Sequence, residues 1–278
     1  MLKLTPFFPY IYLTSFIMIV LYVSYLTVFY VTQDDMLFQS PPFSDNDIAS
    51  IENDEHYEEV RINVEDNLSL HGWLLHQKDA PSPAPLLIYF GGNAEVASQS
   101  IDDFEVLSKW NVLFVNYRGY GLSDGEPSEE TLFHDAEVIY DVMKERSDVK
   151  EDQIVIMGRS MGSAPATHVS KQRDVAGTIL VSPYDNRKRL IKHRYPLLPF
   201  SSLIRHPFEN SDKAPYIMSP VLGFIATEDK VIPPDHSEKT LVSWGGPNRT
   251  IWIDGYGHND LQTTDSYWEG IQTFLNEL

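Results

Sequence analysis

The fold is decided by one stretch of sequence, Ile154-Val155-Ile156-Met157-Gly158-Arg159-Ser160-Met161-Gly162. Four consecutive apolar residues are typical of a buried strand, and the residues from Gly162 to Lys171 have the pattern of a helix. The serine therefore stands at a sharp turn from strand to helix. Its two flanking glycines leave room for neighbouring backbone to pass close to that turn. The turn exposes the hydroxyl above the strand ends, where open α/β sheets bind ligands.

Short apolar runs and longer amphipathic stretches alternate on both sides of this motif. The apolar runs have the length of buried strands and lie at 86–90, 112–116, 153–157, 177–181, 221–226 and 250–253. The expected helices lie at 94–109, 129–145, 162–171, 236–244 and 264–276. This alternation predicts a mostly parallel sheet flanked by helices. A hairpin of two strands, 59–64 and 68–76, is expected to precede the parallel part.

Two further segments complete the predicted organisation. The connection between Val181 and Val221 is about forty residues long, which is too long for an ordinary crossover, so we expect a small inserted cap at about 183–215. Residues 34–56 are polar and acidic without clear periodicity, which indicates a linker or an arm that wraps around the domain. The α/β domain is therefore expected over 57–278.

The N-terminal segment has no charged residue from Leu4 to Gln33. Residues 11–31 would cover roughly 31 Å as a helix, against about 30 Å for the hydrocarbon core of a bilayer. A cleaved signal peptide and a buried core helix are the alternatives, but a signal peptide has a shorter apolar region that ends in small residues. We predict an uncleaved, single-pass transmembrane anchor over 1–33. Lys3 before the span weakly favours a catalytic domain on the non-cytoplasmic side.

Composition excludes several classes of function. The 278 residues carry a net charge of −19, which argues against a nucleic-acid partner because phosphates need a basic surface. The absence of cysteine excludes disulfides, thiolate metal sites and a cysteine nucleophile. No histidine pair has the H-x-H or H-E-x-x-H spacing of a metal site. We therefore expect neither a metal nor another cofactor.

The expected cap is basic although the chain as a whole is acidic. Its cations are interspersed with apolar residues and include Arg187, Lys188, Arg189, Lys192, Arg194 and Arg205. Such a run is usually a solvated face. The alternative is a surface that meets anionic lipid headgroups or an anionic substrate.

A serine nucleophile needs a base, and the base needs an acid that orients it. On a sheet of this kind both follow the serine, in loops after later strands. The loop after 221–226 offers Glu228 and Asp229, and the loop after 250–253 offers His258. His236 is a second possible base, although its place at the start of a helix fits a solvated position better.

Negative charge that develops on a carbonyl oxygen is stabilised by backbone N–H groups. One such donor is expected from Met161, the residue after the serine. The other is expected from the glycine-rich loop 91–94 that follows the strand at 86–90.

Together these motifs resemble the α/β-hydrolase superfamily and, within it, membrane-anchored serine hydrolases related to the serine-aminopeptidase-like group. The resemblance covers about residues 57–278 and rests on five segments, 89–95 (YFGGNAE), 116–121 (NYRGYG), 158–162 (GRSMG), 229–233 (DKVIP) and 257–260 (GHND). In the family the acid precedes a short apolar pair and a proline, which implies Asp229 rather than Glu228. In the family, the residue that follows the pair matching Gly91-Gly92 is the second oxyanion donor. The resemblance therefore implies this role for Asn93. The family commonly has His-Gly in place of Gly91-Gly92.

The resemblance implies an α/β-hydrolase fold and a Ser160-His258-Asp229 triad that hydrolyses an ester, a thioester or an amide. A membrane location and an apolar cap favour small-molecule or lipid-like acyl esters and thioesters. A serine peptidase or amidase is the first alternative. A hydrolase fold that only binds a partner is the second.

Overall fold

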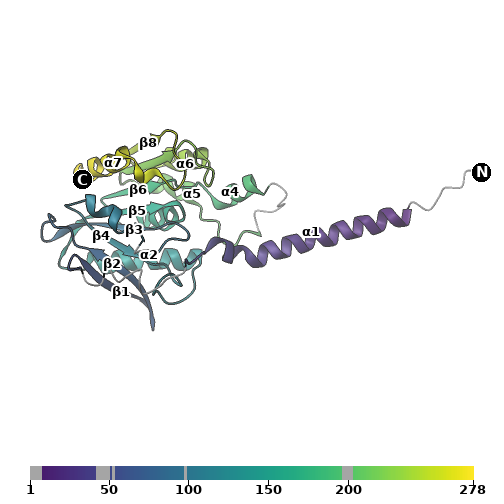
Figure 1. The fold of residues 1–278 in the computed structure, drawn as a ribbon, viewed down its shortest axis with the longest axis horizontal. Coiled ribbons are helices and arrows are strands. Elements are labelled where there is room, and N and C mark those ends of the chain that lie inside the picture. Colours follow the sequence, from purple (N-terminus) through teal and green to yellow (C-terminus); the bar gives the residue numbers. More distant parts are fainter. Residues whose placement is uncertain (1–7, 42–50, 52–53, 97–98, 196–202) are drawn as a thin grey trace, which may run out of the picture.

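The computed structural model describes residues 8–41, 51, 54–96, 99–195 and 203–278. Its centre is one sheet of eight strands in the order β1-β2-β4-β3-β5-β6-β7-β8 (Figure 1). The strands are β1 (Tyr57–Glu65), β2 (Leu68–Leu75), β3 (Ala84–Phe90), β4 (Asn111–Val115), β5 (Val149–Arg159), β6 (Gly177–Val181), β7 (Val221–Ala226) and β8 (Asn248–Ile253). The β1-β2 hairpin is antiparallel and pairs antiparallel with β4, whereas all later pairings are parallel. The predicted mostly parallel sheet is confirmed.

Side chains of the central strands alternate between two hydrophobic cores. In β3, Leu86, Ile88 and Phe90 face one core, and Leu87 and Tyr89 face the other. Both faces of this strand are buried, which explains why its sequence is a continuous apolar run rather than an alternating one. The edge strand β1 has one face exposed and accordingly alternates between apolar and polar residues.

Helices cover both faces of the sheet. The described α-helices that follow the first strand are α2 (Glu129–Lys144), α3 (Ser163–Gln172), α4 (Arg187–Arg194), α5 (Asn210–Lys213), α6 (Pro234–Val242) and α7 (Asp265–Asn276). Buried residues of α2, α3 and α6 join the first core, and those of α7 join the second. Between β6 and β7, the structure describes α4, α5 and the short 3-10 helix η6 (Ala214–Tyr216), while residues 196–202 of the expected cap lie outside the described chain.

The helix expected at 94–109 is wrong. The described part of this segment consists of turns and 3-10 conformation, including the helix η3 (Asp102–Val106). Its buried residues, Ile101, Phe104, Leu107 and Trp110, recur every three residues, and each successive backbone N–H donates to the carbonyl three residues earlier. A spacing of three matches the 3-10 helix and not the 3.6-residue period of an α-helix.

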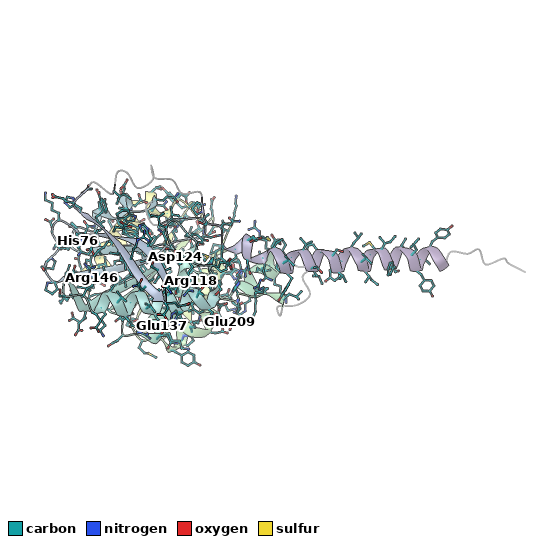
Figure 2. All side chains as sticks on the ribbon, turned by 90° about the horizontal axis from the view of Figure 1, so that it is seen from below. His76, Arg118, Asp124, Glu137, Arg146 and Glu209 are labelled. Atoms are coloured by element: carbon teal, nitrogen blue, oxygen red, sulfur yellow. The ribbon has the colours of Figure 1, made fainter. Side chains whose placement is uncertain are left out.

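A long N-terminal helix, α1 (Phe8–Leu37), projects from the domain (Figure 1). Of the described residues, Tyr10–Leu37 form the only helix long and apolar enough to cross a membrane. Figure 2 shows its apolar side chains extending outward along most of its length. The helix continues through residues 34–37, which were expected to begin the linker, because its last turns pack against the domain and bury Phe29 and Gln33. Residues 42–50 and 52–53 of the expected linker lie outside the described chain.

Candidate active site

Ser160 occupies a tight turn between β5 and α3. It belongs to a short 3-10 helix, η4 (Ser160–Gly162), and its φ of 52° lies in the left-handed region that non-glycine residues rarely adopt. A Cβ on Gly162 would lie 2.0 Å from the carbonyl oxygen of Phe90, and one on Gly158 would lie 2.3 Å from that of Gly162. Only glycine therefore fits on either side of the serine.

Three side chains form a continuous chain of hydrogen bonds at the carboxyl ends of the parallel strands. Nε2 of His258 lies 2.9 Å from Oγ of Ser160, and Nδ1 of His258 lies 2.7 Å from Oδ2 of Asp229. Asp229 follows β7 and His258 follows β8. The structure thus brings together the three residues of the expected triad from segments up to 98 positions apart.

The carboxylate of Asp229 is held in one orientation by its backbone surroundings. Its Oδ1 accepts hydrogen bonds from the backbone N–H of Val231 and Ile232, at 2.9 and 2.8 Å. Burial alone would raise the pKa of Asp229, but the hydrogen bonds and the charge of His258, together with these two N–H groups, lower it below its ordinary value. The carboxylate is therefore ionised and oriented toward the imidazole.

The alternative residues lie elsewhere. Glu228 is exposed beside the buried Asp229. His236 is 7% exposed rather than solvated as expected, because its Nδ1 lies 2.6 Å from Oδ1 of the buried Asp185. Lys239 and Arg189 also pair with Asp185. This second aspartate-histidine pair joins α6 to the loop after β6, and sequence reasoning missed it because 51 residues separate the two side chains.

We expect Asp185→Asn to destabilise the protein by about 2 kcal/mol at pH 7, because it removes the charge that three donors share. Burial opposes ionisation of Asp185, but the hydrogen bonds from His236, Arg189 and Lys239 outweigh it and hold its pKa well below the usual range. A carboxylate with a lowered folded-state pKa stabilises the protein above its unfolded pKa of about 3.9 and loses that contribution at lower pH. The gap in thermal midpoint between wild type and variant should therefore shrink from pH 7 to pH 3.

The matched control is the exposed Asp152, whose side chain makes no hydrogen bond or ion pair with any residue that the structure describes. Asp152→Asn should change the midpoint little at either pH. A gap between wild type and Asp185→Asn that stays constant down to pH 3 would contradict the ionic role of Asp185.

The expected oxyanion residues share a cavity with the serine. This cavity has a volume of about 210 Å³, and its lining residues are Leu37, Asn93, Ser160, Met161, Tyr184, Arg187, Leu190, Ile191, Arg194, Val231 and Ile232. The side-chain oxygen of Asn93 accepts hydrogen bonds from the Ala94 N–H at 3.0 Å, the Tyr120 hydroxyl at 3.1 Å and the Gln39 N–H at 2.9 Å. Two other parts of the chain, at Tyr120 and Gln39, therefore hold the loop that carries Asn93.

Two charged residues that sequence reasoning did not single out connect the loops of the site. Nη1 of Arg159 pairs with Oε2 of Glu95 at 2.9 Å, and Nη2 of Arg159 donates to Oδ1 of Asn259 at 2.8 Å. Glu95 also accepts the N–H of Gly92 at 2.8 Å. The pair thus connects the glycine loop, the serine turn and the histidine loop. Both residues lie inside the quoted motifs, but only the fold brings them together.

The comparisons with known proteins agree with this architecture. A family model described as serine aminopeptidase S33 matches residues 81–203. An uncharacterized membrane protein of Saccharomyces cerevisiae is 31% identical over 227 residues, which are 80% of each chain. An uncharacterized protein of Mycobacterium tuberculosis is 30% identical over 224 residues, which are 79% of each chain. Alpha/beta hydrolase domain-containing protein 17B of Homo sapiens is 28% identical over 201 residues, 71% of this chain and 68% of the relative.

Solved structures show the same fold at lower identity. An esterase of Pyrococcus furiosus superposes with a TM-score of 0.67 at 19% identity, over 86% of this chain and 98% of the esterase. An acetyl xylan esterase from Paenibacillus superposes with a TM-score of 0.62 at 16% identity, over 88% and 98%. The family model, the relatives at 30% identity or more and the sheet topology all agree. The chain belongs to the α/β-hydrolase superfamily.

Proposed function

We propose that this protein is a membrane-anchored serine hydrolase that cleaves acyl esters or thioesters through an acyl-enzyme. One observation carries the proposal, the hydrogen-bonded chain from Asp229 through His258 to Ser160, with distances of 2.7 and 2.9 Å. A serine at the left-handed turn of β5, next to an oriented imidazole, has the geometry of an activated nucleophile.

The reaction follows from this geometry. Nε2 of His258 accepts the proton of the Ser160 hydroxyl while Oγ attacks the carbonyl carbon. The N–H groups of Met161 and Asn93 stabilise the oxyanion, and the charge of Asp229 stabilises the imidazolium. The imidazolium then donates its proton to the leaving alcohol or thiol, which leaves an acyl group on Ser160. His258 next accepts a proton from water, which attacks the acyl-enzyme, and the acid is released with Ser160 regenerated.

The cavity lining favours an acyl substrate over an aminopeptidase substrate, although the matching family model is named for aminopeptidases. An aminopeptidase must bind the ammonium group of its substrate, which calls for a carboxylate. Among the residues that the structure describes, the lining instead holds two arginines, Arg187 and Arg194, and no acidic residue. Five of its other residues are aliphatic, Leu37, Leu190, Ile191, Val231 and Ile232. An uncharged or anionic acyl substrate is therefore the better match.

The membrane location rests on α1 and on the relative named a membrane protein in yeast. In the organisation that we propose, residues 1–33 are a single-pass anchor and 34–56 are a linker, whose first four residues form the last turn of α1. Residues 57–278 are then the catalytic domain, with a cap at about 183–215, on the non-cytoplasmic side.

A fluorophosphonate probe tests the proposal because it reports an activated serine without knowledge of the substrate. We expect the full-length protein in detergent to be labelled at Ser160, as mapped by peptide mass. In a panel of p-nitrophenyl esters, acyl thioesters and aminoacyl anilides, the esters and thioesters should be hydrolysed at least about 10-fold faster than the anilides. A folded protein that takes up no probe would favour the binding-protein alternative, and faster anilide hydrolysis would favour a peptidase.

A further inference from the structure

The last turn of α1 and the two residues after it contribute directly to the candidate active site. Leu37 lines the same cavity as Ser160. Two residues later, the backbone N–H of Gln39 donates to Oδ1 of Asn93 at 2.9 Å, across 54 positions of sequence. Because Asn93 is a proposed oxyanion residue, the segment after the membrane helix touches both the substrate cavity and the catalytic loop.

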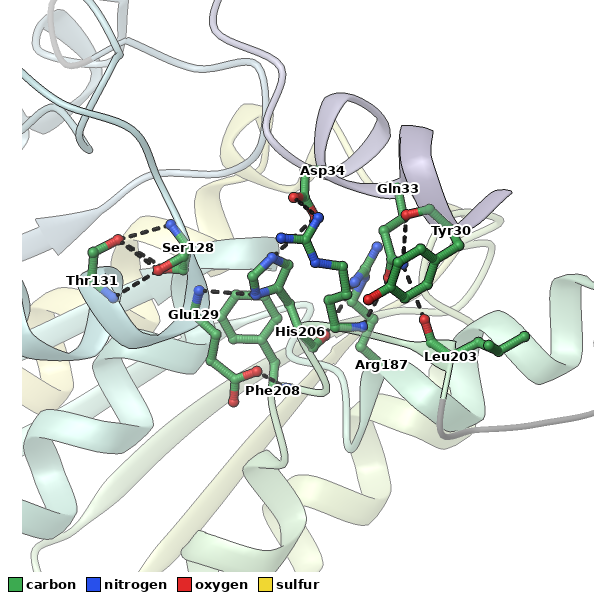
Figure 3. A network of polar contacts seen from close by, with 11 residues as sticks. Tyr30, Gln33, Asp34, Ser128, Glu129, Thr131, Arg187, Leu203, His206 and Phe208 are labelled. Carbon is green, nitrogen blue, oxygen red and sulfur yellow. Dashed lines mark hydrogen bonds and ion pairs between the residues drawn. The ribbon is translucent and has the colours of Figure 1, made fainter. Parts of the chain in front are cut away.

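Polar contacts hold this end of α1 against the cap region (Figure 3). The side chain of Gln33 is fully buried, donates to the carbonyl of Leu203 at 3.0 Å and accepts the N–H of Arg205 at 2.9 Å. Asp34 pairs with Arg205 at 2.5 Å and with His206 at 3.1 Å. Both the NH2 group and the carbonyl oxygen of this buried amide therefore have a hydrogen-bond partner in the domain. Rotation of α1 would break both bonds and leave buried polar atoms without partners, so the helix has a defined orientation relative to the domain.

The same network continues from the cap into the domain. Nδ1 of His206 accepts the N–H of Glu129 at the start of α2, at 3.2 Å (Figure 3). Nη1 of Arg187 donates to the carbonyl of His206 at 3.1 Å, and Arg187 itself lines the cavity. The ring of Phe38 packs edge-on against His206, with ring centroids 5.3 Å apart. A displacement of α1 would therefore disturb a residue of the cavity wall.

The position of this segment along α1 places the cavity near the membrane surface. The side chains from Tyr10 to Val28 are mostly exposed, as expected of residues that face lipid. Leu37 lies six residues beyond Val31, which is roughly 9 Å along the helix axis. The headgroup layer on each side of a bilayer begins where the hydrocarbon ends and is several ångströms thick. The cavity thus lies at about headgroup depth if the apolar part of α1 spans the bilayer.

The charges of the cap agree with this placement. Lys188 pairs with Glu209, Arg189 with Asp185 and Arg205 with Asp34, so half of the basic run is neutralised. Lys192 and Arg194 of α4 are exposed and make no ion pair with any residue that the structure describes. Figure 1 shows α4 extending from the domain on the side from which α1 leaves. Unpaired cations on that side would face anionic headgroups.

We propose that the end of α1 contributes two groups to an active site that faces the membrane, the side chain of Leu37 and the backbone N–H of Gln39. The acyl chain of the substrate passes from the bilayer along α1 and binds against Leu37, while Gln39 positions the oxyanion loop through Asn93. The inference rests on the proposed hydrolase function and deepens it, because it names the substrate class as a membrane-resident ester or thioester of a long acyl chain.

A chain-length comparison on the full-length protein in phosphatidylcholine vesicles tests the role of Leu37. We expect Leu37→Trp to lower kcat/KM for p-nitrophenyl laurate by about 10-fold, because the added bulk fills the cavity, and to change that for p-nitrophenyl acetate by less than about 2-fold. Met36→Trp is the matched control, since Met36 is exposed on α1 and absent from the cavity lining. Equal effects of Leu37→Trp on both esters, or no effect on either, would overturn the proposed chain site.

A backbone substitution tests the role of Gln39. Gln39→Pro removes the N–H donor, and we expect kcat to fall by about 10- to 100-fold for both esters with KM nearly unchanged, because misplacing an oxyanion loop slows the chemical step. Gln39→Ala is the reference for this variant, because both lose the exposed glutamine side chain and only the proline variant also loses the backbone donor. Wild-type kcat in a folded Gln39→Pro protein would overturn the positioning role.

Asn93→Ala provides a second route if the proline variant does not fold. It removes the acceptor of the Gln39 hydrogen bond and keeps the backbone N–H of residue 93, so it should lower kcat to a similar degree. Fluorophosphonate labelling of the wild type tests the hydrolase function separately from the roles of Leu37 and Gln39. A wild type that is not labelled would contradict the hydrolase function. A labelled wild type whose Leu37 and Gln39 variants keep normal kcat and kcat/KM would contradict only the roles of those two residues.

Discussion

Ser160→Ala should abolish fluorophosphonate labelling and lower kcat for acyl esters by roughly 10⁴-fold or more. The hydroxyl is the only group that the proposed mechanism allows to form the acyl-enzyme, and its hydrogen bond to His258 is 2.9 Å long. Removal of a triad serine leaves only the stabilisation supplied by the oxyanion donors and by substrate binding. Steady-state hydrolysis of p-nitrophenyl butyrate, with purification controls for contaminating esterases, measures the loss.

The control for this result is Ser266→Ala, which removes an exposed serine at the start of α7. Its activity and labelling should match those of the wild type. Thermal unfolding of Ser160→Ala should also match the wild type, because alanine and serine have similar difficulty in adopting the left-handed backbone at this position. Retention of labelling in a folded Ser160→Ala protein would refute the assignment of the nucleophile.

Asp229→Asn should lower kcat by roughly 10³- to 10⁴-fold although it changes the size of the side chain very little. Because Oδ1 of Asp229 accepts two backbone N–H groups, the carbonyl oxygen of the asparagine must occupy that place. Its NH2 group then faces Nδ1 of His258 and forces the ring proton onto Nε2. A protonated Nε2 cannot accept the proton of Ser160, so the base is lost through the wrong tautomer.

Glu228→Gln is the matched control, since it neutralises the adjacent carboxylate in the same loop. Glu228 is exposed, and we expect its substitution to change kcat by less than about 2-fold. Comparable losses in the two variants would mean that the negative charge of the loop, rather than the orientation of His258, supports the reaction. A loss confined to Glu228→Gln would transfer the role of the acid to that residue.

Much of the fold could be predicted because local sequence determines it. The runs 177–181 and 221–226 match β6 and β7 at both ends. The second run is bounded by Pro220 and Thr227, and the first begins at a glycine and ends before Ser182. The order of Ser160, Asp229 and His258 along the chain follows from parallel strands whose carboxyl ends share one edge of the sheet. Each of the three residues could therefore be identified from its position directly after a predicted strand.

The missed features all depend on the details of tertiary contact. The segment 94–109 has enough apolar residues for a helix, but their spacing of three and the positive φ of Ala94 produce 3-10 turns instead. The Arg159–Glu95 pair joins residues 64 positions apart. The contact between Gln33 and the segment after α4 spans 170 positions, so no local pattern could reveal it. Such pairs form only after the backbone has placed both partners.

The left-handed backbone of Ser160 has a consequence for engineering. An L residue in that conformation is less favourable than glycine by roughly 1–2 kcal/mol, and the rest of the fold must supply this free energy. Glycine would relax the turn while it removes the proposed nucleophile. A selection for thermal stability alone would therefore favour inactive clones at this position. Directed evolution of this protein would need an activity screen in every round to retain the serine.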